Sequence, residues 1–222
     1  MKNILVYGAS GHSKMIVDII HKNKSHNIIG YIDSYKKAGE ELYGYKVLGN
    51  DTQLNQISVE YNVDHIVIGV GENSVRRNAW KKITTNAPNI KFESIIHPNA
   101  ILAENINLGK GVVIMAGVII NADASIGEFC ILNTNSSLGH DSVMKDFSSI
   151  APGVAVGGNV TIGYGSALCL KAGVIQNITI GDNTVVAAGA IVVKDIGDNK
   201  LAKGVPANDI VERLKDHRYL GK

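Results

Sequence analysis

His140 and Asp141 are adjacent in this sequence and have the side chains of a general base and its orienting carboxylate. A neutral imidazole can take a proton from an attacking amine or hydroxyl, and a carboxylate beside it can orient the ring. The pair ends the polar run Asn133-Thr134-Asn135-Ser136-Ser137-Leu138-Gly139-His140-Asp141. We expect His140 to be a general base oriented by Asp141. The alternative is an exposed or stacked histidine without a catalytic role.

A second group of residues has the types that bind a nucleotide. Gly8-Ala9-Ser10-Gly11-His12 follows an apolar run, Asp33 comes about 20 residues later, and Gly69-Val70-Gly71-Glu72-Asn73 follows another apolar run. Gly11 would let a ligand approach the backbone, amides at His12 would favour an anion, and Asp33 would accept from a ribose or base. The third glycine of the dinucleotide fingerprint is absent. An ordinary strand-to-helix turn is the alternative.

The elements that hold these turns belong to the first 95 residues. Hydrophobic patterning predicts strands over 3–7, 27–32 and 64–70, and helices over 13–22, 52–61 and 74–84. Such alternation implies right-handed crossovers and a small parallel sheet. The turns and Asp33 then share the carboxyl edge, where open α/β sheets bind ligands. A sheet too short for two mononucleotide halves favours one nucleotide over NAD.

A period of six residues governs the middle of the chain. Every sixth residue from Leu102 to Val192 is aliphatic or methionine, and the residue four places after each anchor is small or aliphatic. One large side chain would point inward from each short extended face, with glycine or asparagine at the corner. Three units make one triangular coil, so the stretch predicts a parallel β-helical prism about five coils and roughly 24 Å long. His140 would stand near a corner and face outward.

The composition and charge of the chain limit the kinds of molecule that it is expected to bind. Residues 102–191 contain nine charged side chains among 90, against 33 among the other 132, which suggests that another surface packs beside the prism. A formal charge of +2 gives no case for nucleic acid or an anionic membrane. We find neither a run of about 18 apolar residues nor a signal-peptide pattern in residues 1–8. At 45% hydrophobic residues, and with 4 prolines beside 24 glycines, disorder and collagen are excluded.

Metal and disulfide chemistry are not favoured. A prism of this kind can carry zinc on three histidines, as in the γ-class carbonic anhydrases, but His140 has no second histidine within the repeat, because His97 precedes it. Cys130 and Cys169 lack metal-ligand spacing and are too few for a disulfide framework. We expect two small buried thiols and a reducing, cytoplasmic location.

The tail resumes ordinary composition after the repeat. Asp195-Ile196-Gly197-Asp198 ends the pattern, and Gly204-Val205-Pro206-Ala207 leads into a short amphipathic helix predicted near 208–217. Such a tail would cap the open last coil. The expected domains are 1–95 (nucleotide-sugar binding), 96–196 (β-helix) and 197–222 (cap).

Together the two parts closely resemble the PglD/NeuD group of sugar acetyltransferases, within the hexapeptide-repeat acyltransferases. Beyond the motifs above, the resemblance rests on 150–153, 157–163 and 204–207, which read Ile-Ala-Pro-Gly, Gly-Gly-Asn-Val-Thr-Ile-Gly and Gly-Val-Pro-Ala. It implies a half-Rossmann domain followed by a left-handed parallel β-helix, and a homotrimer with acetyl-CoA in the groove between prisms. The left hand comes from the resemblance, since parallel crossovers in general favour the right.

The resemblance also implies residue roles. His140 would be the base, Asp141 its partner and Asn133 a nearby polar residue. The residues expected to line the acetyl-CoA groove are Gly158, Leu170 and Ala188, and those expected near the nucleotide are Gly11, His12, Asp33 and Asn73. Many relatives have a second histidine nine residues after the base, contacting the acetyl group. Ser149 stands there in this chain, so that contact is a hydroxyl that cannot titrate.

The implied function is N-acetylation, by acetyl-CoA and without a metal, of a nucleotide-activated aminodeoxy sugar such as a UDP-4-amino-4,6-dideoxy sugar, for surface polysaccharide synthesis. The amine would attack the thioester directly while His140 removes its proton and backbone amides near Gly158 stabilise the oxyanion. O-acetylation of sialic acid or a related sugar is one alternative. A non-catalytic trimeric scaffold that senses a nucleotide is another.

Overall fold

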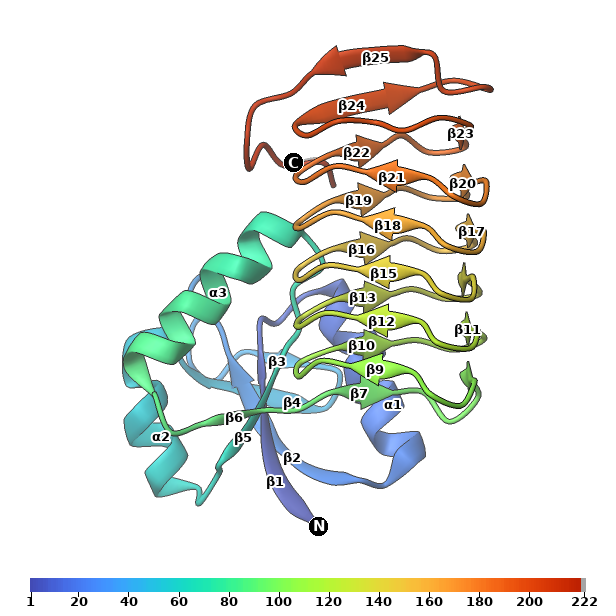
Figure 1. The fold of residues 1–222 in the computed structure, drawn as a ribbon. Coiled ribbons are helices and arrows are strands. Elements are labelled where there is room, and N and C mark those ends of the chain that lie inside the picture. The colour runs from blue at the N-terminus through green and yellow to red at the C-terminus, as the bar shows by residue number, and fades with distance from the viewer. Residues whose placement is uncertain (221–222) are drawn as a thin grey trace. The chain divides into compact units, whose positions relative to one another are not determined.

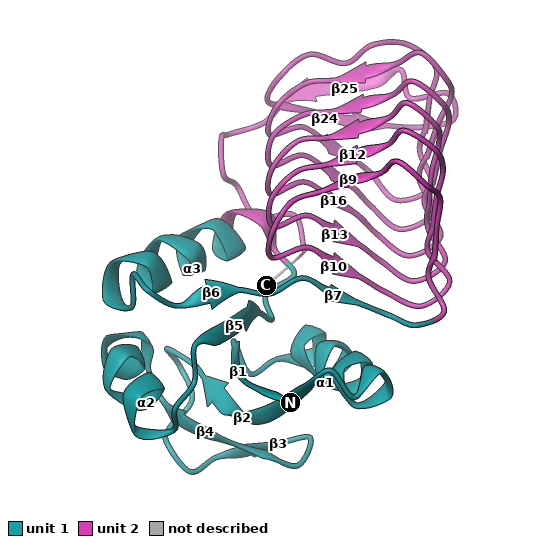
Figure 2. Cartoon of the chain, turned by 60° about the horizontal axis from the view of Figure 1, so that its bottom comes forward, with its two compact units in different colours: residues 1–71, 75–98 teal, residues 72–74, 99–222 magenta. Residues whose placement is uncertain are grey.

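The computed structural model describes residues 1–220 and divides into two compact units, of which unit 1 comprises residues 1–71 and 75–98 and unit 2 comprises residues 72–74 and 99–222 (Figure 2). No helix of the described residues is long and apolar enough to cross a membrane. The same residues contain no group of three or more His, Cys, Asp or Glu side chains placed to hold a metal ion.

Unit 1 is a small α/β sheet with helices. Its elements in chain order are β1 (Lys2–Tyr7), α1 (Gly11–Asn23), β2 (His26–Ile32), β3 (Glu41–Leu42), β4 (Tyr45–Gly49), the 3-10 turn η1 (Asp51–Gln53), α2 (Leu54–Glu60), β5 (His65–Ile68), α3 (Asn73–Asn86), β6 (Lys91–Phe92) and β7 (Ile95–Ile96). The sheet order is β3-β4-β2-β1-β5-β6, parallel except for the β3–β4 hairpin. Ile4, Leu5 and Val6 are fully buried in its central strand. The predicted parallel sheet is confirmed, and β3, β4 and β6 are additions to it.

The carboxyl ends of three strands meet as predicted. Gly8 N donates to Ile32 O at 2.7 Å, which joins the ends of β1 and β2, and Gly69 N donates to Tyr7 O at 2.7 Å, which joins β5 to β1. The turns after β1, β2 and β5 therefore share one edge of the sheet.

Unit 2 is a parallel β-helix (Figure 1). Its strands β8 to β23 have two residues each, and each ends on one of the sixteen predicted anchors. The first face consists of β8 (Ile101–Leu102), β11 (Ile119–Ile120), β14 (Ser137–Leu138), β17 (Ala155–Val156), β20 (Gly173–Val174) and β23 (Ile191–Val192). The second face consists of β9 (Asn107–Leu108), β12 (Ser125–Ile126), β15 (Val143–Met144), β18 (Thr161–Ile162) and β21 (Thr179–Ile180). The third face includes β10 (Val113–Ile114), β13 (Ile131–Leu132), β16 (Ser149–Ile150), β19 (Ala167–Leu168) and β22 (Val185–Val186).

The coils stack in register. Each strand from β8 to β20 pairs with the strand 18 residues later, as Leu138 does with Val156 and Val156 with Val174, and the coil winds left-handed in Figure 1. Anchors from Ile114 to Val192 are at most 5% exposed. The anchor phase predicted from the sequence is therefore confirmed.

The structure corrects the prediction about where glycine is needed at the corners of the β-helix. All fifteen residues that lie three places after an anchor, from Asn105 to Gly189, have positive φ, and five of them are glycine. Glycines directly after an anchor are needed for a different reason. A Cβ on Gly139 would lie 2.2 Å from Gly157 O, so these glycines let successive coils approach. Left-handed backbone and close approach thus fall at different positions of the repeat.

The predicted C-terminal helix near 208–217 is wrong. The chain instead forms β24 (Lys200–Lys203), which pairs parallel with β22, and β25 (Asp209–Glu212), which pairs antiparallel with β24. A ten-residue amphipathic stretch gains little as an isolated helix, whereas the open edge of the last coil offers unpaired backbone groups. The cap is therefore a hairpin.

The anchor phase can be tested with two adjacent residues of β17. Val156 is 5% exposed and points into the prism, whereas its neighbour Ala155 is exposed. Val156→Asp should prevent cooperative folding because it buries an unpaired charge. Ala155→Asp should keep the circular-dichroism spectrum and a cooperative thermal transition. A soluble, cooperatively unfolding Val156→Asp variant would contradict the inward phase.

Candidate active site

His140 and Asp141 lie at the corner between β14 and β15 and contact each other. His140 Nδ1 is 2.7 Å from Asp141 Oδ2, and the two side chains are 67% and 60% exposed. A carboxylate can only accept, so Nδ1 carries a proton, and in the neutral ring the lone pair is on Nε2. Asp141 occupies the left-handed corner at φ 59°, a conformation that Asp tolerates better than most residues. The corner thus presents an exposed, oriented imidazole with a basic Nε2.

Gly158 lies directly against the His140 ring. A Cβ added to Gly158 would be 2.4 Å from His140 Nε2 and 2.6 Å from Cε1. The next coil is tied to the same corner, because Asn159 N donates to His140 O at 2.8 Å. Gly158 therefore leaves room for the imidazole, and its backbone is close to the atom that would take a proton.

Asn133 and Ser149 lie away from His140 within one chain. Asn133 follows β13 at the corner between the third and first faces, where its Oδ1 accepts from Thr134 N at 2.8 Å. Ser149 lies in β16 on the third face, which is opposite the corner that carries His140. Its Oγ is 2.9 Å from the hydroxyl of Tyr219, a residue for which the sequence predicts no role.

Leu170 and Ala188 stack on one another at a second corner. Both follow strands of the third face, Gly189 N donates to Leu170 O at 2.9 Å, and both side chains are exposed. Gly158, the remaining residue expected in the acetyl-CoA groove, lies at the corner of His140 instead. A single prism therefore separates these three residues by the width of its first face.

At the sheet edge of unit 1, the carboxylate of Asp33 accepts hydrogen bonds from three backbone N–H groups. Its Oδ2 accepts from Ala9 N at 2.7 Å, and its Oδ1 accepts from Tyr35 N and Lys36 N at 2.8 and 2.9 Å. Burial raises the pKa of Asp33, but the three backbone N–H groups outweigh it, so the net pKa is lowered. Asp33 therefore joins the turn after β1 to the turn after β2, and one acceptor position on Oδ2 remains.

Gly11 and His12 begin α1 beside this turn. An added Cβ on Gly11 would meet nothing within 4 Å, so the space above it is open. Burial, with a smaller effect of the Arg76 charge, lowers the pKa of His12 to about 4, which makes its imidazole neutral at pH 7. Among the described residues, His12 Nε2 is buried without a hydrogen-bond partner. His12 thus offers an uncharged polar group at the edge where a nucleotide was expected.

A polar network at the same edge was not predicted from the sequence. Ser34 Oγ donates to Asp51 Oδ1 at 2.7 Å, Lys82 Nζ is 3.0 Å from Asp51 Oδ2, and Tyr7 OH is 3.3 Å from Ser34 Oγ. The signal was present in the sequence, since Tyr7 ends β1, Ser34 follows β2 and Asp51 follows β4. These residues add a cation and hydroxyls to the edge.

Asn73 hydrogen-bonds to residues of the β-helix. Its Nδ2 donates to Gly165 O at 3.1 Å and Ser166 O at 3.0 Å, and its Oδ1 accepts from Tyr219 OH at 3.0 Å. The residue is 3% exposed and belongs to unit 2. Its amide is thus engaged with the β-helix, and its expected place near the nucleotide stays a prediction.

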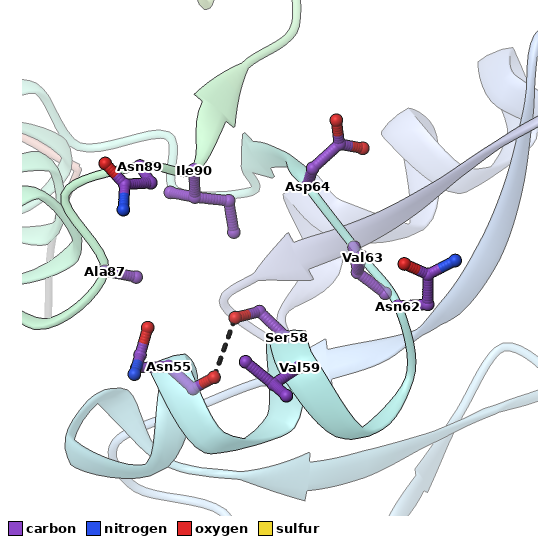
Figure 3. Close-up of a pocket in the computed structure, with 9 residues that line it drawn as sticks. All are labelled: Asn55, Ser58, Val59, Asn62, Val63, Asp64, Ala87, Asn89 and Ile90. Atoms are coloured by element: carbon purple, nitrogen blue, oxygen red, sulfur yellow. Dashed lines mark hydrogen bonds between the residues drawn. The ribbon is translucent and has the colours of Figure 1, made fainter.

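Unit 1 also has a cavity of about 360 Å³ at the opposite edge of the sheet (Figure 3). It is lined by Asn55, Ser58, Val59, Asn62, Val63, Asp64, Ala87, Asn89 and Ile90. These residues lie around the end of α2, the start of β5 and the segment before β6. The cavity contains none of the predicted site residues.

The role of Asp33 can be tested through stability. The pKa of Asp33 in the folded protein lies below its unfolded value of about 3.9, so the ionised carboxylate stabilises the folded protein above that pH. This stabilisation is lost as the pH falls through the folded-state pKa. Asp33→Asn should therefore lower the free energy of unfolding at pH 7 by about 1–2 kcal/mol, with the difference shrinking below about pH 4. Urea denaturation at both pH values measures this. A difference that does not change with pH would contradict a depressed Asp33 pKa.

Comparison with known proteins agrees with this architecture. Residues 3–83 match the family described as the PglD N-terminal domain. The crystal structure of a histidine-to-asparagine variant of perosamine N-acetyltransferase from Caulobacter crescentus, in complex with CoA and GDP-perosamine, is 30% identical with a TM-score of 0.88, covering 94% of this chain and 96% of that chain. The acetyltransferase domain of PglB from Neisseria gonorrhoeae, in complex with acetyl coenzyme A, is 29% identical with a TM-score of 0.85, covering 93% of this chain and 98% of that chain.

Curated relatives cover the chain less evenly. GDP-perosamine N-acetyltransferase of Escherichia coli O157:H7 is 24% identical over 178 residues, which are 76% of this chain and 78% of that protein. Two serine acetyltransferases also match, and the chain spans 38% and 41% of their lengths. The likeness to perosamine N-acetyltransferase covers 94% of this chain and therefore extends over both units, whereas the two serine acetyltransferases match 42% and 52% of it. The chain therefore belongs to the PglD/NeuD-type sugar acetyltransferases of the hexapeptide-repeat superfamily, which are acetyl-CoA-dependent enzymes with a left-handed β-helix.

Proposed function

We propose that the protein transfers the acetyl group of acetyl-CoA to the amino group of a nucleotide-linked aminodeoxy sugar. The observation that carries the proposal is the His140–Asp141 pair, because the 2.7 Å contact at Nδ1 leaves a basic Nε2 exposed over Gly158. The sheet edge with Gly11, His12 and Asp33 supplies a place for the nucleotide. The relatives that bind or act on GDP-perosamine support an amine acceptor.

The chemistry needs one base and no protein nucleophile. The sugar amine attacks the thioester carbonyl, and His140 Nε2 accepts its proton as the C–N bond forms. The C–S bond then breaks, the CoA thiolate leaves, and the proton on His140 can pass to that thiolate. The N–H groups of Gly157 and Asn159 donate to Val174 O and His140 O, so the Gly158 N–H is the backbone donor that we propose stabilises the oxyanion between these steps.

We further propose that the active unit is a homotrimer. One chain places His140 on one corner, Leu170 and Ala188 on a second, and Ser149 on the third face, so prisms must lie side by side to bring these residues together. The first and second faces carry exposed apolar side chains, Ile101 at 63%, Ile119 at 40% and Val143 at 37%, which suit contact with another copy. In this assembly Leu170, Ala188 and Ser149 would meet acetyl-CoA held near a neighbour's His140.

The cell compartment and pathway follow from the same chemistry. Acetyl-CoA and nucleotide sugars are used in the cytoplasm, and both cysteines are free thiols. A nucleotide-linked, N-acetylated aminodeoxy sugar is a building block for surface polysaccharide or glycan. We therefore place the enzyme in the cytoplasmic part of such a synthesis.

The base assignment predicts a large loss of activity without a loss of fold. His140→Ala should reduce acetyl transfer about 10²- to 10⁴-fold while leaving the thermal transition unchanged. The assay follows acetyl-CoA consumption against UDP- and GDP-linked 4-amino sugars, with free sialic acid beside them. His21→Ala, which removes an exposed histidine of α1, is the matched control. Unchanged turnover of the His140 variant would overturn the assignment.

The same panel separates the alternatives. Transfer to sialic acid but not to amino sugars would favour O-acetylation. A wild-type protein that consumes no acetyl-CoA with any acceptor but binds UDP or GDP would favour a non-catalytic scaffold.

Gly158 gives a second test of the geometry. Gly158→Ala would place a methyl group 2.4 Å from His140 Nε2, so the ring must move and kcat should fall about 10- to 100-fold. Gly197→Ala is the control, because an added Cβ there meets only Lys200 Cε at 4.0 Å. Activity should be retained in the control. A Gly158→Ala enzyme with wild-type kcat would show that the ring position is not critical.

A further inference from the structure

Three residues of the α/β sequence belong to the β-helix. Glu72, Asn73 and Ser74 lie between β5 and the body of α3 in the chain, yet they cluster with unit 2 and are coloured with it in Figure 2. Glu72 and Asn73 are 8% and 3% exposed. The turn Gly69–Gly71 and the helix α3 are therefore covalently continuous with a segment that the prism holds.

The C-terminal segment from Arg213 to Leu220, which we call the strap, holds this segment from the other side. Tyr219 N and Leu220 N donate to Glu72 Oε2 at 3.1 and 3.0 Å. Tyr219 OH donates to Asn73 Oδ1 at 3.0 Å and lies 2.9 Å from Ser149 Oγ. The far end of the chain thus supplies hydrogen bonds to both Glu72 and Asn73.

The strap is fixed at its two ends. At its start, Arg213 N donates to Asn199 O at 2.9 Å and Arg213 Nη1 donates to Asn183 O at 2.8 Å. Residues 214–218 between the two ends are exposed, and Leu214 is 78% exposed. Since little apolar surface is buried along the strap, its closure depends on a few hydrogen bonds and can open locally.

The segment that the strap holds leads straight into the predicted acceptor-binding edge. Arg76 of α3 donates from Nη1 to Gly71 O at 2.7 Å and to Val70 O at 3.3 Å, so the turn after β5 is tied to the first turn of α3. The first hydrogen bonds of α3 end on carbonyls of the held segment. A shift of Glu72 and Asn73 must therefore shift the turn.

We propose that the strap is a positioning element for the nucleotide-sugar site, with Tyr219 as its positioning residue. It acts through Glu72 and Asn73 on the turn Gly69–Gly71 and takes no part in the chemical step. This inference rests on the proposed function, because it takes the sheet edge to bind the acceptor. It assigns to Tyr219 an effect on acceptor binding and none on acetyl-CoA.

The experiment compares Tyr219→Phe with the wild-type full-length chain. The variant keeps the ring and removes the hydroxyl that bonds to Asn73 and Ser149. We expect hydrogen exchange at the amides of residues 77 and 78, which donate to the carbonyls of Asn73 and Ser74, to become about threefold to tenfold faster, and the KM for the nucleotide amino sugar to rise by a similar factor. The kcat and the KM for acetyl-CoA should stay within about twofold of wild type. Tyr43→Phe, which removes an exposed hydroxyl from the β3–β4 hairpin, is the control and should change neither quantity.

A second variant checks that the effect passes through the strap. Glu72→Ala removes the acceptor of the Tyr219 and Leu220 amides and should reproduce the faster exchange. The double variant should then add less than the sum of the two single effects, because both open the same contact.

The outcomes separate the two proposals. Unchanged exchange in Tyr219→Phe, or a fall in kcat with an unchanged acceptor KM, would overturn the positioning role. A wild-type enzyme that transfers no acetyl group to any nucleotide amino sugar would overturn the proposed function, and the exchange comparison would still decide whether the strap holds α3.

Discussion

The 18-residue register between stacked coils is the constraint on which the functional geometry depends. Each strand pairs with the strand one coil above, so residues separated by 18 positions share a face or a corner. His140 is therefore placed over Gly158, and Leu170 is placed beside Ala188. Nine positions, or half a coil, carry the chain from the corner of His140 to the opposite face, where Ser149 lies. The repeat thus decides which residues can meet within one chain and which can meet only between chains.

Buried polar groups help to hold this register. Ser142 Oγ donates to Gly157 O at 3.1 Å and accepts from Val160 N at 3.1 Å, so one hydroxyl bridges two coils beside the His140 corner. Ser166 Oγ makes the same pair of bonds higher in the prism, to Gly181 O at 2.6 Å and from Thr184 N at 2.8 Å. A buried hydroxyl without partners would cost about 1–3 kcal/mol, but here donor and acceptor are both used. The small residue four places after each anchor is thus more than a space filler.

Two corners combine backbone strain with aromatic packing. Phe129 and Phe147 both have φ 57°, a conformation that costs a bulky residue of order 1–3 kcal/mol. Their rings stack at 5.0 Å with an interplanar angle of 14°, and Tyr164 packs edge-on against Phe147 at 5.8 Å. Both phenylalanines are at most 5% exposed. Stacking and burial therefore offset a strain that glycine or asparagine avoids at most other corners.

The sequence predicts what is periodic or adjacent, and it fails where contacts are distant. The anchors follow from a period of six, and the contact between His140 and Asp141 follows from adjacency. The hairpin β24–β25 could not be predicted, because its strands are stabilised by the open edge of the last coil rather than by their own pattern. Asp33 was correctly placed at the sheet edge, but the three backbone donors that occupy it depend on how two loops close.

The contacts of Tyr219 show most clearly what cannot be predicted from the sequence. It lies 146 residues from Asn73 and 70 from Ser149, and nothing in its local sequence marks it. The Tyr219 hydroxyl lies between Asn73 and Ser149, two residues to which the sequence assigned different roles, one near the nucleotide and one near the acetyl group. The structure thereby couples Ser149 and Asn73 through a single oxygen atom. Contacts across 70 and 146 residues leave no mark in the spacing or periodicity of the chain, so the sequence could not predict this junction.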